Sequence, residues 1–141
     1  MLGYHYINVS FASDEAKRAY ESASIPIIIG NHVSLMDPLF IVYRFAPSQI
    51  SALENKSIPF LGNYLVAMKG IFVNRKDKDS RTTVIKAINI WAERHTVDPL
   101  RYSPVAIFPE GTTTSGKQII QFKKGAFTPG LPVLPIVFKY P

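Results

Sequence analysis

The sequence predicts an α/β fold, in which helices flank a mixed, mostly parallel sheet within a single domain. Two observations predict it. Short segments rich in β-branched residues alternate with longer segments that carry apolar residues at helical spacing, and prolines and glycines separate them. The short apolar run at residues 25–30 is typical of a buried parallel strand, and polar residues follow it directly. At 141 residues the chain has the length of one domain.

The first half of the chain is expected to contain two strands and two helices. After the strand at 25–30, a helix is expected over 38–45, because Asp37 suits the N-cap and Pro38 the first helical position. A strand is expected over 49–53. Apolar residues at helical spacing then predict a helix over 58–69, closed by a glycine.

The second half repeats the alternation. An extended run at 71–73 precedes the strongest helix prediction, residues 80–94, where four apolar side chains share one stripe. They are Val84, Ile85, Ile88 and Trp91. Two further core strands are expected at 105–108 and 133–138, whereas 119–125 has the pattern of a short strand and turn.

Composition limits the kinds of chemistry open to the chain. Sixteen basic and ten acidic residues leave a net charge of +6, which favours an anionic partner such as a phospholipid head group, a phosphorylated small molecule or a nucleic acid. The absence of cysteine excludes disulfides, thiolate zinc sites and a cysteine nucleophile. No apolar run approaches the ~20 residues that span a bilayer, and the first residues lack the pattern of a signal peptide.

Residues 111–117, GTTTSGK, match most of the phosphate-loop pattern G-x-x-x-x-G-K-[ST]. A working loop needs a helix that begins at its Gly-Lys and a Ser or Thr to hold magnesium. Position 118 is glutamine, and Glu110 would place a carboxylate beside the phosphates. We therefore expect a turn rather than a nucleotide site.

His32 and Asp37 lie on either side of a predicted turn between a strand and a helix, in an H-x-x-x-x-D pattern. A carboxylate that accepts a hydrogen bond from one ring nitrogen fixes the tautomer and lets the other nitrogen take a proton from a hydroxyl. A loop histidine and a helix cap are the alternatives. His5 and His95 lie at no metal-ligand spacing to His32, so no metal site is expected. No G-x-S-x-G elbow supports a serine nucleophile, so the substrate should supply the nucleophile.

Four separated blocks occur in order: NHVSLMD at 31–37, GIFVNR at 70–75, FPEGTTT at 108–114 and LPVLPIV at 131–137. Together they resemble the motif blocks of the glycerolipid (1-acylglycerol-phosphate type) acyltransferase superfamily. The sequences LGYHYI, EGTTTSGK, FKKGAFTPG and FKYP are similar to the plant-type lysophosphatidylethanolamine and lysophosphatidylcholine acyltransferases. Thr113 stands where many members of the superfamily have arginine, which fits the lysophospholipid branch.

The resemblance implies roles for particular residues. His32 would be the general base and Asp37 would orient it. Six residues would bind the acyl acceptor or its phosphate: Ser34, Arg75, Glu110, Gly111, Thr112 and Lys123. Lys124 is an equal rival to Lys123. Backbone amides near Gly111 or in the first block are expected to stabilise the oxyanion.

The implied reaction moves an acyl chain from acyl-CoA, a co-substrate, to the free hydroxyl of a lysophospholipid, with no bound cofactor and no acyl-enzyme. The resemblance also implies a glycerolipid acyltransferase-like fold, with a lead-in over 1–24 and a catalytic core over 25–141. It implies a membrane-associated protein of the endoplasmic reticulum or another endomembrane, with its site facing the cytosol and further sequence on either side of this chain.

Three alternatives stay open. The acceptor could be lysophosphatidic acid or glycerol-3-phosphate. The domain could instead be a catalytically silent module that binds anionic lipid, although the presence of both His32 and Asp37 argues against this. Nucleic-acid binding through the basic segments at 75–81 and 117–124 lacks any recognised module.

Overall fold

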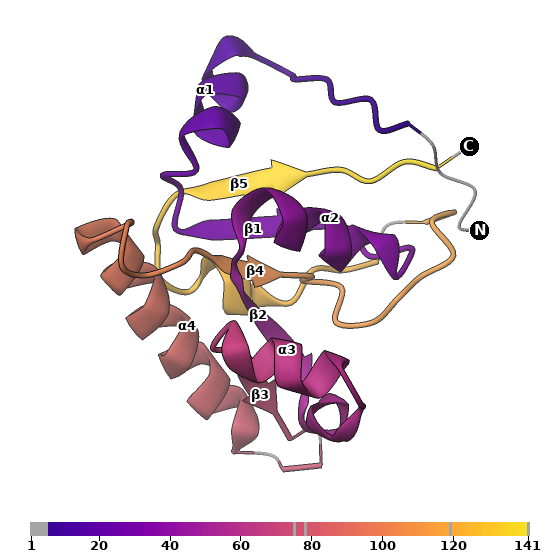
Figure 1. The fold of residues 1–141 in the computed structure, drawn as a ribbon, viewed down its shortest axis with the longest axis vertical. Coiled ribbons are helices and arrows are strands. Elements are labelled where there is room, and N and C mark those ends of the chain that lie inside the picture. Colours follow the sequence, from indigo (N-terminus) through magenta and orange to yellow (C-terminus); the bar gives the residue numbers. More distant parts are fainter. Residues whose placement is uncertain (1–5, 75, 78, 119, 141) are drawn as a thin grey trace.

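The structure is a computed structural model of the chain, and it describes residues 6–74, 76–77, 79–118 and 120–140. Its centre is a five-stranded sheet in the order β3-β2-β4-β1-β5 (Figure 1). The strands are β1 (Ile27–Gly30), β2 (Ser48–Ala52), β3 (Ile71–Val73), β4 (Val105–Ile107) and β5 (Val133–Ile136). All four strand pairings in the described residues are parallel, so the predicted α/β fold is confirmed.

In the described residues, four α-helices flank the sheet (Figure 1). They are α1 (Asp14–Ser22), α2 (Met36–Phe45), α3 (Leu61–Ala67) and α4 (Ser80–Val97). Two short 3-10 helices also occur in the described residues: η1 (Leu53–Ser57) between β2 and α3, and η2 (Lys124–Phe127) between β4 and β5.

The alternation of side chains along β1 gives the sheet two apolar faces. Ile27 and Ile29 pack in one cluster with Ile88 and Ala92 of α4, whereas Ile28 packs in the other with Ile41 of α2. Full burial of such a side chain contributes ~1.5–3 kcal/mol, so β1 is fixed between two helical layers. This strand carries the residues that follow it, His32 among them, on a rigid support.

The observed boundaries differ from the predicted ones where proline or a cap decides them. Helix α3 begins at Leu61 rather than at residue 58, because Ile58 is the extended residue that ends η1 and Phe60 has a non-helical φ of +63°. The segment 120–123 is not a strand, and η2 begins at Lys124. Helix α1 was not predicted, although Ser13 caps it by accepting a hydrogen bond from the backbone N–H of Ala16.

Candidate functional site

The candidate site lies at the carboxyl ends of β1 and β4, which are neighbours in the sheet. His32 comes two residues after β1, and Glu110 comes three residues after β4. Because parallel strands all end at the same edge of a sheet, two segments about eighty residues apart in sequence meet there. The backbone records the meeting, since the Thr114 N–H donates to the His32 carbonyl at 2.7 Å.

His32 and Asp37 form the predicted pair. The His32 Nδ1 lies 3.1 Å from the Asp37 Oδ2. Asp37 is fully buried, whereas the imidazole is 21% exposed. A carboxylate can only accept, so Nδ1 carries the proton and Nε2 keeps its lone pair. Nε2 has no hydrogen-bond partner in the described residues and is not among their buried unpaired atoms, so solvent reaches it.

The Asp37 carboxylate is held by further donors. Its Oδ2 accepts from the backbone N–H of Val33 at 2.7 Å and of Ser34 at 2.8 Å, and its Oδ1 accepts from the Tyr140 hydroxyl. A buried carboxylate must be compensated in this way. The four donors therefore fix its position and hence that of the imidazole.

The prediction that Asp37 would occupy the helix N-cap is wrong. Helix α2 begins at Met36, and Leu35 holds the cap position with helical torsion angles and no side-chain cap bond. The Asp37 carboxylate reaches back to amides that precede the helix. Pro38 is accommodated within the first turn, where backbone N–H groups have no partner inside the helix.

The imidazole is also held from the side. The His32 ring stacks on Phe108, with ring centroids 4.4 Å apart and planes 28° from parallel. Phe108 directly follows β4, so the stack joins the ends of two strands. Together with the bond to Asp37, it leaves the ring little freedom to rotate.

Sequence reasoning missed Tyr140 and the residue that positions it. The Asn31 side-chain amide bonds both polar groups of the Phe138 backbone: its Nδ2 donates to the carbonyl at 3.0 Å and its Oδ1 accepts from the N–H at 2.7 Å. This continues the β1–β5 pairing beyond Gly30 and Ile136. The Asn31 side chain thus extends the hydrogen bonding between β1 and β5 by one residue pair, and the residues after Phe138 then run toward Asp37. No local pattern in the sequence signals a contact over this separation.

The Glu110 turn forms the second half of the site. Glu110 is 3% exposed, and its Oε2 has no partner in the described part of the chain. Gly111 has φ +74°, and an added Cβ would lie 2.2 Å from the Lys123 Nζ. The glycine is therefore required both for the turn and for the approach of the ammonium group. Between the two rival lysines, the structure brings Lys123 to the turn, whereas Lys124 starts η2.

The other predicted residues have more varied positions. The Ser34 Oγ accepts from the Met36 N–H at 3.2 Å, close to Asp37, and Thr112 is exposed beside Gly111. Arg75 lies outside the described residues. No group of three or more acidic or histidine side chains in the described residues could hold a metal ion.

Residues 111–117, which match most of the phosphate-loop pattern, do not form a nucleotide-binding loop. No helix starts at Gly116 or Lys117 within the described residues. Gly116 instead packs against Val33, whose side chain an added Cβ would meet at 3.1 Å. The threonine-rich turn therefore lies over the histidine block, as the Thr114 bond to His32 also shows.

Comparisons with known proteins show which family the chain is similar to. A family model described as Acyltransferase matches residues 13–139. The chain is 40% identical over 116 residues to the lysophospholipid acyltransferase LPEAT2 of Arabidopsis thaliana, and the aligned region covers 82% of this chain and 21% of that protein. It is 33% identical over 141 residues to the lysophospholipid acyltransferase LPCAT4 of Xenopus tropicalis, and this aligned region covers 100% of this chain and 25% of that protein. The chain therefore spans about a quarter or less of the length of these two curated relatives.

A solved structure is also similar. The 1-acyl-sn-glycerophosphate acyltransferase PlsC of Thermotoga maritima superposes with a TM-score of 0.56 at 25% identity. The match covers 84% of this chain and 52% of that one.

Proposed function

The chain belongs to the acyltransferase family, and from that premise we propose that it transfers a fatty acyl group from acyl-CoA to the free hydroxyl of a lysophospholipid. The relatives named above are lysophospholipid acyltransferases, which supports the choice of acceptor. The observation that carries the proposal is the His32–Asp37 pair, with the imidazole oriented by a buried carboxylate and its second nitrogen open to solvent.

The proposed reaction is a direct transfer. His32 Nε2 removes the proton from the acceptor hydroxyl as the oxygen attacks the thioester carbonyl carbon. The tetrahedral intermediate then collapses with cleavage of the carbon–sulfur bond, and the imidazolium returns the proton to the leaving thiolate. Asp37 keeps Nδ1 protonated and stabilises the positive charge that His32 acquires in between.

Several of the amides expected to stabilise the oxyanion already have acceptors. The amides of Val33 and Ser34 donate to Asp37, and that of Gly111 donates to the Phe108 carbonyl at 2.9 Å. The next amide of the turn, at Thr112, donates to no group in the described residues. We assign it to the oxyanion.

The acceptor phosphate would bind at the Glu110 turn. The Lys123 ammonium lies against Gly111, so it can contact a phosphate there as a point charge. Arg75 would supply a second cation, with Ser34 and Thr112 as hydroxyl contacts. The buried Glu110 carboxylate, with one unpaired oxygen, would accept a hydrogen bond from an acceptor hydroxyl.

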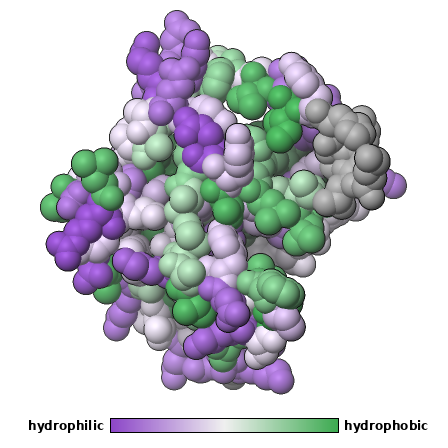
Figure 2. Space-filling view, in the orientation of Figure 1, coloured by the Kyte–Doolittle hydropathy of each residue, from purple (hydrophilic) through white to green (hydrophobic). Residues whose placement is uncertain are grey.

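An amphiphilic acceptor requires contact with a membrane surface. No helix in the described part of the chain is long and apolar enough to cross a bilayer. Leu35 and Leu39, at the start of α2, are 71% and 46% exposed, and Figure 2 shows apolar residues on the face that carries this helix. With the net charge of +6, this face suits the anionic cytosolic side of an endomembrane, such as that of the endoplasmic reticulum.

Lysophosphatidic acid is the second candidate acceptor. The similarity to PlsC, a lysophosphatidic acid acyltransferase, favours it. The two candidates differ in head group and share the same hydroxyl chemistry.

The test is release of coenzyme A from acyl-CoA with a panel of lysophospholipids, lysophosphatidic acid and glycerol-3-phosphate in liposomes. A thiol reagent can follow the reaction without background, because the chain has no cysteine. We expect turnover with lysophospholipid and its loss in His32→Ala. Lys123→Met should raise the apparent KM for the acceptor, whereas the matched Lys124→Met should not. Full turnover in a folded His32→Ala would refute the assigned base.

A further inference from the structure

A small cavity lies at the edge of the sheet opposite to the candidate site. Its lining comes from the amino ends of three strands: Ser48 begins β2, Lys69 comes two residues before β3, and Ser103 two residues before β4. His32 and Glu110 follow the carboxyl ends of β1 and β4. Since the strands are parallel, the two sites are on opposite edges.

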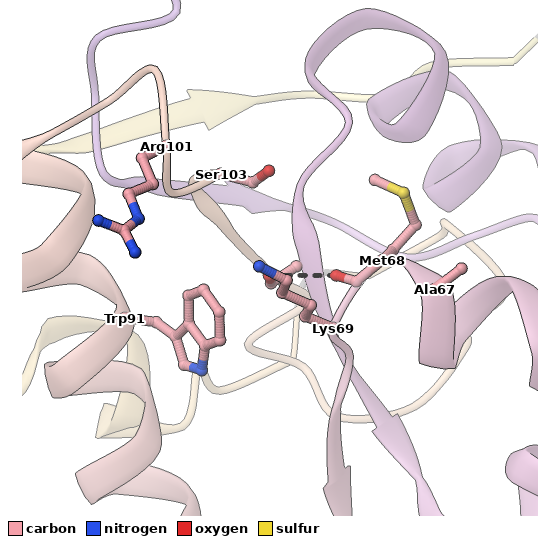
Figure 3. Close-up of a pocket in the computed structure, with 7 residues that line it drawn as sticks. Ala67, Met68, Lys69, Trp91, Arg101 and Ser103 are labelled. Atoms are coloured by element: carbon pink, nitrogen blue, oxygen red, sulfur yellow. Dashed lines mark hydrogen bonds between the residues drawn. The ribbon is translucent and has the colours of Figure 1, made fainter.

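The cavity is bordered by two cations. Figure 3 shows the side chains of Lys69 and Arg101 on either side of a space that the Trp91 indole borders. The Lys69 Nζ lies 5.8 Å from the indole centroid, and on the same indole the Arg94 Cζ lies 5.9 Å from it. Two cations therefore lie near the indole, and Arg101, whose Cζ lies 5.5 Å from the centroid of the Tyr102 ring, lines the same cavity.

These charges have no acidic partner among the residues that the structure describes. The ion pairs found there are Lys17–Glu21 and His32–Asp37. Asp98, the acidic residue nearest to Arg101 in sequence, accepts from the backbone N–H of Arg101 at 3.1 Å, and no ion pair with the Arg101 guanidinium occurs in the described residues. Grouped cations without counter-charges repel one another and create a positive potential that an anion would relieve.

The size and polarity of the cavity define the ligand. Its volume is about 100 Å³, enough for several water molecules or one tetrahedral oxyanion. The Ser48 hydroxyl is committed to the Met68 carbonyl at 3.2 Å, whereas the Ser103 hydroxyl makes no hydrogen bond in the described residues. We propose that this cavity binds a phosphate group, held by Lys69, Arg101 and the Ser103 hydroxyl. The group can be a free phosphate or the phosphate of a lipid head group.

The chain contains its own reporter for this site. Trp91 is the one tryptophan in the sequence, and it lines the cavity, so tryptophan fluorescence reports on this place alone. We would titrate the protein with inorganic phosphate at constant ionic strength, with chloride as the reference salt. A second titration would use phosphatidylcholine vesicles with and without phosphatidic acid.

We expect a saturable fluorescence change with phosphate, with phosphatidic acid vesicles, or with both. Saturation by phosphate alone identifies a free anion as the source, and a response to phosphatidic acid vesicles alone identifies a lipid head group. Because a hydrogen bond to a charged group accounts for about a tenfold change in affinity or more, Arg101→Gln should weaken binding about tenfold. Lys69→Gly should do the same, and it should fold well because residue 69 has φ +54°.

Two variants serve as controls. Lys86→Gln removes one charge from the exposed side of α4 and should leave the titration unchanged. His32→Ala should also leave it unchanged, so failure of the proposed acyl transfer and failure of this site can be told apart. No saturable change with either probe, an equal change with chloride, or wild-type affinity in both Arg101→Gln and Lys69→Gly would overturn the proposal.

Discussion

Replacement of Asp37 gives the most direct test of how the site is held. In Asp37→Ala, three part-buried donors lose this acceptor: the amides of Val33 and Ser34 and the Tyr140 hydroxyl. His32 can move its proton to Nε2 and is not counted. Each lost hydrogen bond costs ~1–3 kcal/mol, and water reaches part-buried donors, so the free energy of unfolding should fall by an amount near the lower end of about 3–9 kcal/mol, against a total of about 5–15 kcal/mol for a typical domain.

Asp37→Asn should behave differently. The amide oxygen can still accept from His32, Val33 and Ser34, and the Tyr140 hydroxyl can turn to accept from the new NH₂ group. The variant should therefore fold, at a cost of about 1–3 kcal/mol for the lost charge, yet it cannot stabilise the imidazolium. We expect a folded protein with strongly reduced acyl transfer.

Urea unfolding, followed by circular dichroism, measures both effects. Asp14→Ala, at an exposed aspartate in the first turn of α1, is the matched control and should cost less than about 1 kcal/mol. If Asp37→Ala unfolded at the same urea concentration as the wild type, the hydrogen-bond network would not hold this carboxylate. Equal stabilities of Asp37→Ala and Asp37→Asn would contradict the expectation that the Asn side chain keeps the hydrogen bonds that the Ala variant loses.

Three further predictions concern tyrosine and glycine positions. Tyr140→Phe should lower the free energy of unfolding by about 1.5–3 kcal/mol, because it removes a bond to a charged group; Tyr64→Phe, which removes a buried hydroxyl with no partner, should leave that free energy unchanged or raise it. Burial raises the pKa of the Tyr64 phenol above 10.0, so the folded state keeps this proton to a higher pH than the unfolded state does. The stability of the wild type to urea should therefore fall as the pH rises above about 10, and it should fall more than that of Tyr64→Phe. Gly111→Ala and Gly130→Ala both place a side chain at positive φ, so the two variants should lose similar amounts of stability. Only Gly111→Ala should raise the KM for the acceptor, because its new Cβ displaces Lys123. Equal KM values in the two variants would refute the contact between Gly111 and Lys123.

The fold could be predicted from local patterns because the central strands β1 and β4 are buried on both faces and are therefore almost wholly apolar. The isoleucine run that became β1 and the apolar stripe of α4 both lie in the observed core. Boundaries were less accurate, since single side chains decide them. Helix α3 begins only after Phe60, whose φ of +63° is not helical, and Ser13 caps α1 in the segment expected to be a lead-in.

The His32–Asp37 pair could be predicted from the sequence, whereas the residues that hold this pair in place could not. The His32–Asp37 pair spans one turn, so their separation in sequence limits their separation in space. Tyr140 and Asn31 act through contacts across 103 and 107 residues, which no local pattern encodes. The cap assignment of Asp37 failed because the carboxylate reached amides on the other side of the helix start. Arg75 stays a prediction, since it lies outside the described residues.

The strand order has a consequence for synthesis of the protein on the ribosome. β1 is made before its two neighbours in the sheet, β4 and β5, which begin at residues 105 and 133. At about 5–20 residues per second, the nascent chain exposes an unpaired isoleucine strand for about 4–20 s before these partners are made. An unpaired apolar strand of this kind is a template for pairing with other chains, so this interval is the one in which the nascent chain is most prone to aggregate. During the same interval His32 is held by neither Phe108 nor Tyr140, and the support of its ring is complete only when both have docked.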